Sequence, residues 1–175
     1  MTAPGDDLRV GLGFDVHRFA AGRSLVLGGE PLAHDQGLEG HSDADVLTHA
    51  VIDALLGAAG LGDIGRWFPD TDPAYRGADS LRLLAYVRRR LGADGWRVVN
   101  VDATVVAERP RLAPHVDAMA ANLAEVLEID RARVSIKATT SEGLGFAGRG
   151  EGIAALATCL LSRLHDAGGA PTAGR

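Results

Sequence analysis

Apolar residues that recur at every second position predict β-strands in several parts of the chain. In residues 8–14 they are Leu8, Val10, Leu12 and Phe14, which is the two-residue period of a strand. Residues 96–107 and 133–138 are rich in β-branched side chains and also predict strands. Residues 24–32 predict a short hairpin that turns at two adjacent glycines. The apolar run at residues 153–161 fits a strand or a helix by period, and we interpret it as a strand.

Three other segments carry apolar residues at the spacing of an amphipathic helix, at residues 42–59, 80–91 and 114–127. The first is expected to begin at Ser42, because Asp45 follows three residues later as in a capping box, with Asp in place of Glu. Strands that alternate with helices predict an α/β fold in which helices pack on a sheet.

Two further segments lack a regular period. Residues 37–40 are expected to be a loop. Residues 60–78 are rich in Gly, Pro and Asp, and an irregular segment of this length exceeds what a connection needs. We therefore expect residues 60–78 to form a functional loop.

The length of 175 residues suits one domain with a substantial core. We expect this domain to span residues 1–166 and residues 167–175 to be a disordered tail. The formal net charge is −5 and the arginines are scattered rather than clustered, so nucleic acid is not an expected partner. Cys159 is the single cysteine, which excludes an internal disulfide and a cysteine-based metal cluster and favours a small core residue.

Membrane insertion is not expected either. The longest uncharged run covers residues 152–162, too short to cross a bilayer. The first residues are acidic and lack the basic and then apolar form of a signal peptide. These features predict a cytoplasmic protein that is not bound to a membrane.

The first candidate site combines Asp15, His17 and His49. Residues two apart on a strand point the same way, so Asp15 and His17 would converge at the strand end. With His49 they would supply three ligands and leave one position open, the pattern of a catalytic zinc site. Asp45 or Asp53, one turn away from His49 on the same helix face, would hold its second ring nitrogen. On spacing alone, a solvated strand end and a solvent-facing helix face explain these residues equally well.

A second candidate site is the glycine-rich segment at residues 137–152. Its backbone N–H groups and the hydroxyls of Thr139 and Thr140 would bind an oxyanion, as phosphate loops do, and Arg149 would clamp a phosphate. Glu142 would fit this setting if a second, hard cation bridged it to phosphate oxygens. The alternative is a flexible surface loop. Residues 108–111 either bind another ligand group or form an exposed turn.

Five separate stretches, taken together, closely resemble one known family. They are residues 11–19, 40–49, 54–65, 68–73 and 137–152, which read GLGFDVHRF, GHSDADVLTH, ALLGAAGLGDIG, FPDTDP and KATTSEGLGFAGRGEG. The family is that of the 2-C-methyl-D-erythritol 2,4-cyclodiphosphate synthases of the non-mevalonate isoprenoid pathway. The resemblance covers about residues 10–161, nearly the whole chain.

The resemblance implies an architecture and a reaction. The subunit would be α/β (α+β), with a single sheet packed on one side by helices, and the sheets would form the core of a homotrimer with active sites between neighbouring subunits. The reaction would convert 4-diphosphocytidyl-2-C-methyl-D-erythritol 2-phosphate to the 2,4-cyclodiphosphate with loss of CMP. The 2-phosphate would attack the β-phosphate, metals would neutralise the charge, and no strong general base would be needed.

The resemblance also implies the metal-binding residues. Asp15, His17 and His49 match the family's Zn²⁺ ligands, with a substrate diphosphate oxygen at the fourth position. Glu142 matches a carboxylate that, with phosphate oxygens, holds Mg²⁺ or Mn²⁺. Thr140 matches a phosphate contact.

The remaining matches lie along the substrate. His41 and Ser42 match positions near its erythritol and 2-phosphate end. Matches to the mobile loop that receives the erythritol part are Asp63, Phe68, Asp70 and Asp72. Matches to the cytidine pocket, which the adjacent subunit contributes, are Ala107, Arg109, Arg111 and Leu112, and Thr139 is a further substrate-binding candidate. Phe146 and Arg149 match a trimer-axis cavity where the family can hold an isoprenoid diphosphate.

Two other functions use the same residues. A metal-dependent phosphohydrolase would employ the same ligands with water as the nucleophile. A non-catalytic trimer that binds zinc and a phosphate compound as a sensor would need no turnover, although a ligand set with an open position argues against it.

Overall fold

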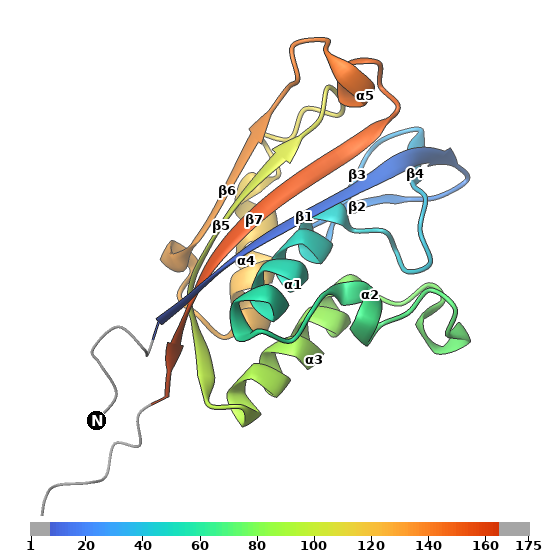
Figure 1. Cartoon of the computed structure of the whole chain (residues 1–175). Coiled ribbons are helices and arrows are strands. Elements are labelled where there is room, and N and C mark those ends of the chain that lie inside the picture. Colours follow the sequence, from blue (N-terminus) through green and yellow to red (C-terminus); the bar gives the residue numbers. More distant parts are fainter. Residues whose placement is uncertain (1–7, 165–175) are drawn as a thin grey trace, which may run out of the picture.

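A five-stranded sheet carries most of the chain's secondary structure, as Figure 1 shows for the computed structural model, which describes residues 8–164. The strands of this sheet follow the order β4-β1-β7-β5-β6. Their bounds are β1 (Leu8–Ala21), β4 (Gln36–Leu38), β5 (Trp96–Val106), β6 (Val134–Thr139) and β7 (Gly152–Arg163). A separate two-stranded hairpin is formed by β2 (Leu25–Leu27) and β3 (Glu30–Leu32).

Strand β7 lies at the centre of the sheet. It pairs antiparallel with β1 on one side and with β5 on the other, and β5 pairs parallel with β6. The predicted strands at residues 8–14, 96–107, 133–138 and 153–161 are therefore confirmed, as is the hairpin at residues 24–32. The mixed sheet and its flanking helices also confirm the expected fold class.

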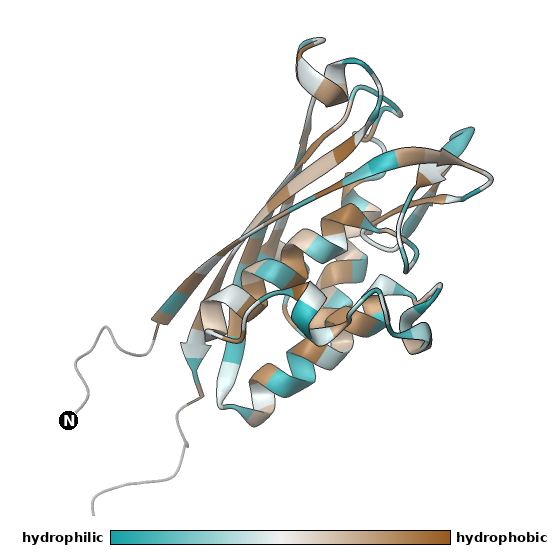
Figure 2. Cartoon of the chain, turned by 45° about the vertical axis from the view of Figure 1, so that its right-hand side comes forward, coloured by the Kyte–Doolittle hydropathy of each residue, from teal (hydrophilic) through white to brown (hydrophobic). Residues whose placement is uncertain are grey.

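Helices cover one face of the sheet (Figure 1). The long ones are α1 (Val46–Ala59), α3 (Ser80–Ala93) and α4 (Val116–Leu127), and the short ones are α2 (Ile64–Trp67), α5 (Gly145–Gly148) and the 3₁₀ turns η1 (Pro73–Tyr75) and η2 (Arg131–Arg133). Helix α1 is buried along almost its whole length, and Figure 2 shows its mainly hydrophobic colour against the strands. Within residues 8–164, none of the helices combines the length and the apolar character that crossing a membrane requires.

Two glycines of β1 let α1 lie directly on the strand. A Cβ atom on Gly11 would stand 1.9 Å from the Ala54 carbonyl oxygen, and one on Gly13 would stand 2.0 Å from that of Ala50. No side chain fits in that space. This close approach brings the first turns of α1 against the part of β1 that holds Asp15 and His17.

The opposite face of the sheet is apolar along β1. The alternating residues Val10 and Leu12 are 74% and 68% exposed, and Leu8, Phe14 and Val16 are also open to solvent. Leu156 of β7 is paired with Phe14 and is likewise exposed. An apolar stripe of this kind is typical of a surface that binds another molecule.

Three expectations from the sequence need correction. Residues 36–38 form strand β4 on the edge beside β1, where a loop was expected from residue 37 onward. Helix α1 begins at Val46, with Asp45 as its N-cap, because Ala44 has a positive φ of 59° that no α-helix contains. Residues 60–78 are not wholly irregular, since they hold α2 and η1. The expected tail at residues 167–175 lies outside the described residues.

Candidate metal centre and substrate pockets

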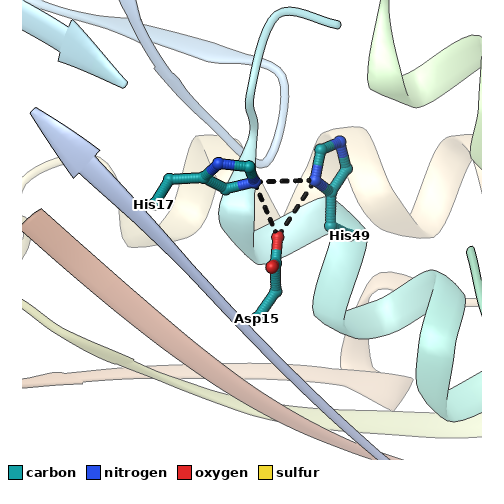
Figure 3. Close-up of side chains that lie close together, drawn as sticks. All are labelled: Asp15, His17 and His49. Carbon is teal, nitrogen blue, oxygen red and sulfur yellow. Dashed lines mark hydrogen bonds and ion pairs between the residues drawn. The ribbon is translucent and has the colours of Figure 1, made fainter. Parts of the chain in front are cut away.

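Three side chains converge where β1 meets the first turn of α1 (Figure 3). The Asp15 Oδ2 atom lies 2.9 Å from His17 Nε2 and 3.0 Å from His49 Nδ1, and the two imidazole nitrogens are 3.2 Å apart. Asp15 and His17 share one face of β1 because they are two residues apart. His49 reaches them from α1 because Gly11 and Gly13 admit the helix so closely.

Electrostatics couple the members of this cluster. Burial favours the neutral acid, but hydrogen bonds from His17 and His49 and their charges outweigh it and hold the pKa of Asp15 below its ordinary value of 3.8. Burial opposes the imidazolium of His17, yet the hydrogen bond and charge of Asp15 raise the pKa of His17 above 6.5. Asp15 thus supplies a negative charge that either a protonated His17 or a bound cation can neutralise.

The donor set fits a divalent metal. One ligand atom from each of Asp15, His17 and His49 lies within 4.8 Å of the others, and one carboxylate with two imidazoles is a recognised ligand set for catalytic zinc. The His17 Nδ1 atom lies 2.6 Å from the backbone carbonyl of Glu39, which places the proton on Nδ1 and leaves Nε2 free as a ligand. A metal ion would take the place of the protons that His17 Nε2 and His49 Nδ1 share with Asp15.

The prediction that Asp45 or Asp53 supports His49 is wrong. Asp45 is fully buried and accepts hydrogen bonds from the N–H groups of Gly28, Gly29 and Thr48, as the cap of α1. Asp53 accepts from the Ile64 N–H at 2.7 Å and so anchors the start of α2. Burial raises the pKa of both carboxyl groups.

The second ring nitrogen of His49 has other partners. Its Nε2 atom lies 2.9 Å from the Ser80 hydroxyl and 3.1 Å from the Ser42 hydroxyl. Ser80 starts α3, is fully buried and donates its hydroxyl to Asp43. Neither Ser80 nor Asp43 was predicted from the sequence to belong to the site. The pair Asp79–Ser80 marks the start of a helix, but nothing in the pattern placed that start against His49.

The metal-binding residues open into a cavity of about 460 Å³. Four of the predicted substrate contacts line it, namely His41, Ser42, Phe68 and Asp70. Two other predicted contacts act as local caps: Asp63 accepts from the Arg66 N–H, and Asp72 accepts from the Ala74 N–H. The Asp72 carbonyl also bonds His41 Nε2 at 2.9 Å, which ties the irregular segment to the cavity wall.

A second cavity, of about 230 Å³, lies past the ends of β5 and β6. The predicted cytidine and phosphate contacts that line it are Ala107, Arg111, Leu112, Thr139 and Thr140. Strand β7 separates β5 from β1, so within one chain this cavity and the metal cluster belong to different parts of the sheet. Glu142 lies on this second side, where its carboxylate accepts from the Thr140 hydroxyl at 2.6 Å.

Glu108 organises the glycine-rich loop and was not predicted to do so. One of its carboxylate oxygens accepts from the Ser141 N–H and hydroxyl at 3.0 Å and from the Gly143 N–H at 3.2 Å. The two N–H bonds and the hydroxyl bond lower the pKa of Glu108. An acidic residue directly after a strand was the only signal in the sequence.

The two residues matched to a trimer-axis cavity lie at α5 and just after it. Phe146 lines a cavity of about 690 Å³ together with His17, Arg18 and Glu151. Arg149 forms an ion pair with Glu151 at 2.8 Å and borders another cavity with Arg109. Arg149 therefore has a carboxylate partner within the chain.

Comparisons with known proteins agree on one family. The model of the YgbB family matches residues 8–162. A 2-C-methyl-D-erythritol 2,4-cyclodiphosphate synthase from Bordetella petrii is 62% identical over 89% of this chain and 96% of its own length. The solved bifunctional IspDF of Campylobacter jejuni has a TM-score of 0.87 at 44% identity over 90% of this chain, which spans only 42% of that protein. A CDP complex of IspF from Plasmodium falciparum has a TM-score of 0.80 at 31% identity, covering 91% of this chain and 99% of that one.

Proposed function

This chain belongs to the YgbB family, whose curated relatives are 2-C-methyl-D-erythritol 2,4-cyclodiphosphate synthases, and on that premise we propose how its residues perform the synthase reaction. The enzyme is a lyase of isoprenoid precursor biosynthesis. Its substrate is 4-diphosphocytidyl-2-C-methyl-D-erythritol 2-phosphate. An oxygen of the 2-phosphate forms a bond to the β-phosphorus, and the bond from that phosphorus to the bridging oxygen breaks, so that CMP leaves with that oxygen.

The convergence of Asp15 Oδ2, His17 Nε2 and His49 Nδ1 at the mouth of the 460 Å³ cavity carries this proposal. These atoms would hold Zn²⁺, and Glu142 together with substrate phosphate oxygens would hold Mg²⁺ or Mn²⁺. Such cations, when bound, neutralise phosphate charge and act as Lewis acids. A phosphate is already an anion, so the chain supplies position rather than a strong base.

The two cavities divide the substrate between them. His41, Ser42, Phe68 and Asp70 receive the erythritol 2-phosphate end, and Asp63 and Asp72 hold the segment that carries Phe68 and Asp70. Ala107, Arg111 and Leu112 receive the cytosine and ribose, while Thr139 and Thr140 contact phosphate. Arg109 follows Glu108 of this second cavity along the chain but lines a neighbouring cavity. The CDP complex of a relative at 31% identity supports a cytidine nucleotide as part of the ligand.

A homotrimer brings the two cavities together. The exposed apolar stripe of β1 offers the surface to be covered, and a neighbouring copy can set its cytidine cavity opposite the metal cluster of the first. A cyclic trimer uses different surfaces on the two sides of each contact, as a site shared between unlike cavities requires. The trimer axis would pass near Phe146 and Arg149, and an isoprenoid diphosphate would bind there. We place the enzyme in the cytoplasm.

Product analysis tests the reaction. The purified chain is incubated with the diphosphocytidyl substrate, Zn²⁺ and Mg²⁺, and the products are separated by chromatography. Release of CMP in equal amount with a cyclic diphosphate is expected. CMP with an open-chain product would identify the phosphohydrolase instead, and binding without CMP would identify the sensor.

Two variants test the metal-binding residues. His49→Ala should abolish turnover while the chain still folds and assembles, and near-normal turnover would refute its assignment. Glu142→Gln should weaken the dependence of the rate on added Mg²⁺. An unchanged Mg²⁺ titration would contradict the role given to Glu142.

A further inference from the structure

The hydrogen bonds on the Nε2 side of His49 form a series in which each group donates to the next. His49 faces the metal cluster through Nδ1, which lies 3.0 Å from Asp15 Oδ2, and faces the protein through Nε2. A histidine can give Nδ1 to a metal only when its proton is on Nε2. Whatever accepts the Nε2 proton therefore selects the form of His49 that binds a metal.

Ser80 is placed to be that acceptor. Its hydroxyl oxygen lies 2.9 Å from His49 Nε2 and is wholly buried. A serine hydroxyl has a single proton, so it accepts from His49 only if that proton points elsewhere. In this structure the Ser80 proton is donated to Asp43 Oδ1.

Asp43 fixes this arrangement with its second oxygen. Asp43 Oδ2 accepts from the Ser80 N–H at 3.0 Å, and Oδ1 also accepts from the Asp45 N–H at 3.2 Å. An ionised carboxylate only accepts hydrogen bonds, so Ser80 cannot turn its proton toward His49 without losing this partner. The Ser42 hydroxyl, 3.1 Å from His49 Nε2, is a weaker second acceptor at the same nitrogen.

We propose that Asp43 and Ser80 are positioning residues that hold His49 in its Nε2–H form and so prepare Nδ1 to bind the metal. This series of hydrogen bonds links Asp43, in the segment before α1, through Ser80, the first residue of α3, to His49 in the first turn of α1. It rests on the metal role given to His49 under the proposed function. Partners of this kind typically contribute 10- to 100-fold to metal affinity.

Metal titration of the purified protein tests the proposal without measuring activity. Zn²⁺ affinity is determined by competition with a chromophoric chelator for the wild type, Ser80→Ala and Asp43→Asn. We expect Ser80→Ala to bind Zn²⁺ about 10-fold or more weakly, with Ser42 retaining part of the acceptor role. In Asp43→Asn the side-chain amide can donate to Ser80, which turns the serine proton toward His49, so affinity should fall at least as far.

The double variant separates a relay from two independent effects. If Asp43 acts through Ser80, then Asp43→Asn should cost little further affinity once Ser80 is Ala. Fully additive losses would overturn the relay. The matched control is Ser162→Ala, which removes another buried serine hydroxyl, one without a hydrogen-bond partner among the described residues, and should leave Zn²⁺ affinity unchanged.

The ring tautomer gives a direct readout in metal-free protein. Long-range ¹H–¹⁵N spectra of ¹⁵N-histidine-labelled chain should show a larger share of the Nε2–H form of His49 in the wild type than in Asp43→Asn, while Asp15 competes for a proton on Nδ1 in both proteins. An unchanged tautomer, or Zn²⁺ affinity of Ser80→Ala within about 2-fold of the wild type, would refute the proposal. A wild type that shows the Nε2–H form but binds no Zn²⁺ would instead refute the metal role of the proposed function.

Discussion

Asp15 and His17 lie 2.9 Å apart on one face of β1, where each shifts the pKa of the other. The strand period had predicted that the two side chains share this face. The partners of His49 were not predictable in the same way. Ser80 lies 31 residues further along the chain, and only the packing of α3 against α1 brings it to the imidazole.

The opposite pKa shifts of Asp15 and His17 predict a pH window for metal-free stability. The lowered pKa of Asp15 gives stability that is present above 3.8 and is lost as pH falls through the folded-state value. The raised pKa of His17 gives stability that is present below 6.5 and is lost as pH rises through its folded-state value. Both contributions coexist between these two pH values.

Asp15→Asn should therefore lower the melting temperature of chelator-treated protein most between about pH 4 and pH 6.5. Thermal unfolding of the wild type and the variant across pH 3 to 9 measures this difference. The penalty should shrink as the pH rises through the folded-state pKa of His17, which lies above 6.5. A penalty of constant size from pH 5 to pH 9 would mean that the ion pair does not form.

Cys159 was expected from the sequence to be a core residue, and the reactivity of its thiol can test this. It is buried on β7, and burial raises the pKa of its thiol to about 12. Because the thiolate is the reactive form, a thiol reagent should label native protein very slowly at pH 8 and label one thiol per chain in denaturant. Fast labelling of the native chain would place Cys159 at the surface instead.

At the scale of elements, the periods predicted the strands and helices but not their ends. Helix α1 was expected to begin at Ser42, but it begins at Val46 because Ala44 has a positive φ. Ser42 therefore lies outside the helix, where it lines the cavity. Strand β4 escaped prediction because its three residues are too short for any period to register and its pairing with β1 is long-range. Pairing between residues that are far apart in the sequence depends on tertiary packing rather than on local propensity.

The contact between β1 and α1 leads to a prediction with an internal control. Gly13→Ala would push a methyl group against the Ala50 carbonyl, where a Cβ has only 2.0 Å, so α1 must move away from β1. We expect a loss of about 1–3 kcal/mol or more in the free energy of unfolding, together with weaker metal binding, because His49 moves with the helix.

Gly57→Ala, in helix α1, is the matched control for Gly13→Ala in strand β1. A Cβ there would meet its nearest neighbour, the Leu12 carbonyl, at 4.0 Å. Alanine also favours a helix over glycine by up to about 1 kcal/mol. Chemical denaturation should therefore show Gly57→Ala to be as stable as the wild type or more so, and equal losses in both variants would argue against a close contact specific to Gly13.

At the scale of the whole molecule, the alternation in β1 correctly predicted a strand but said nothing about which side is covered. The apolar set of Val10, Leu12 and Phe14 faces away from the helices, while the glycines and the metal-binding residues face toward them. The pattern of a single sequence does not say whether such an apolar face is buried inside the chain or available to another copy. The resemblance to a trimeric family supplied that expectation, and the stripe gives it a physical basis.

Disrupting the stripe should disrupt assembly. Leu12→Asp places a charge at a position that is 68% exposed in the isolated chain and would be desolvated in a trimer. We expect light scattering to show a monomer with native circular dichroism and no turnover, because a monomer holds the two cavities apart. A trimer of normal mass with normal turnover would exclude this face from the interface.

Mixed trimers test whether each active site combines two chains. His49→Ala removes the metal side of a site and Glu142→Gln removes the second cation on the other side. If both sides came from one chain, every site in an equal mixture of the two variants would carry one of the two defects. If they come from neighbours, a cyclic trimer that assembles at random pairs an intact metal side with an intact second side in about a quarter of its sites. Mixing the variants after mild unfolding and refolding should therefore recover about a quarter of wild-type turnover, and recovery no higher than the sum of the separate variants would confine the active site to one chain.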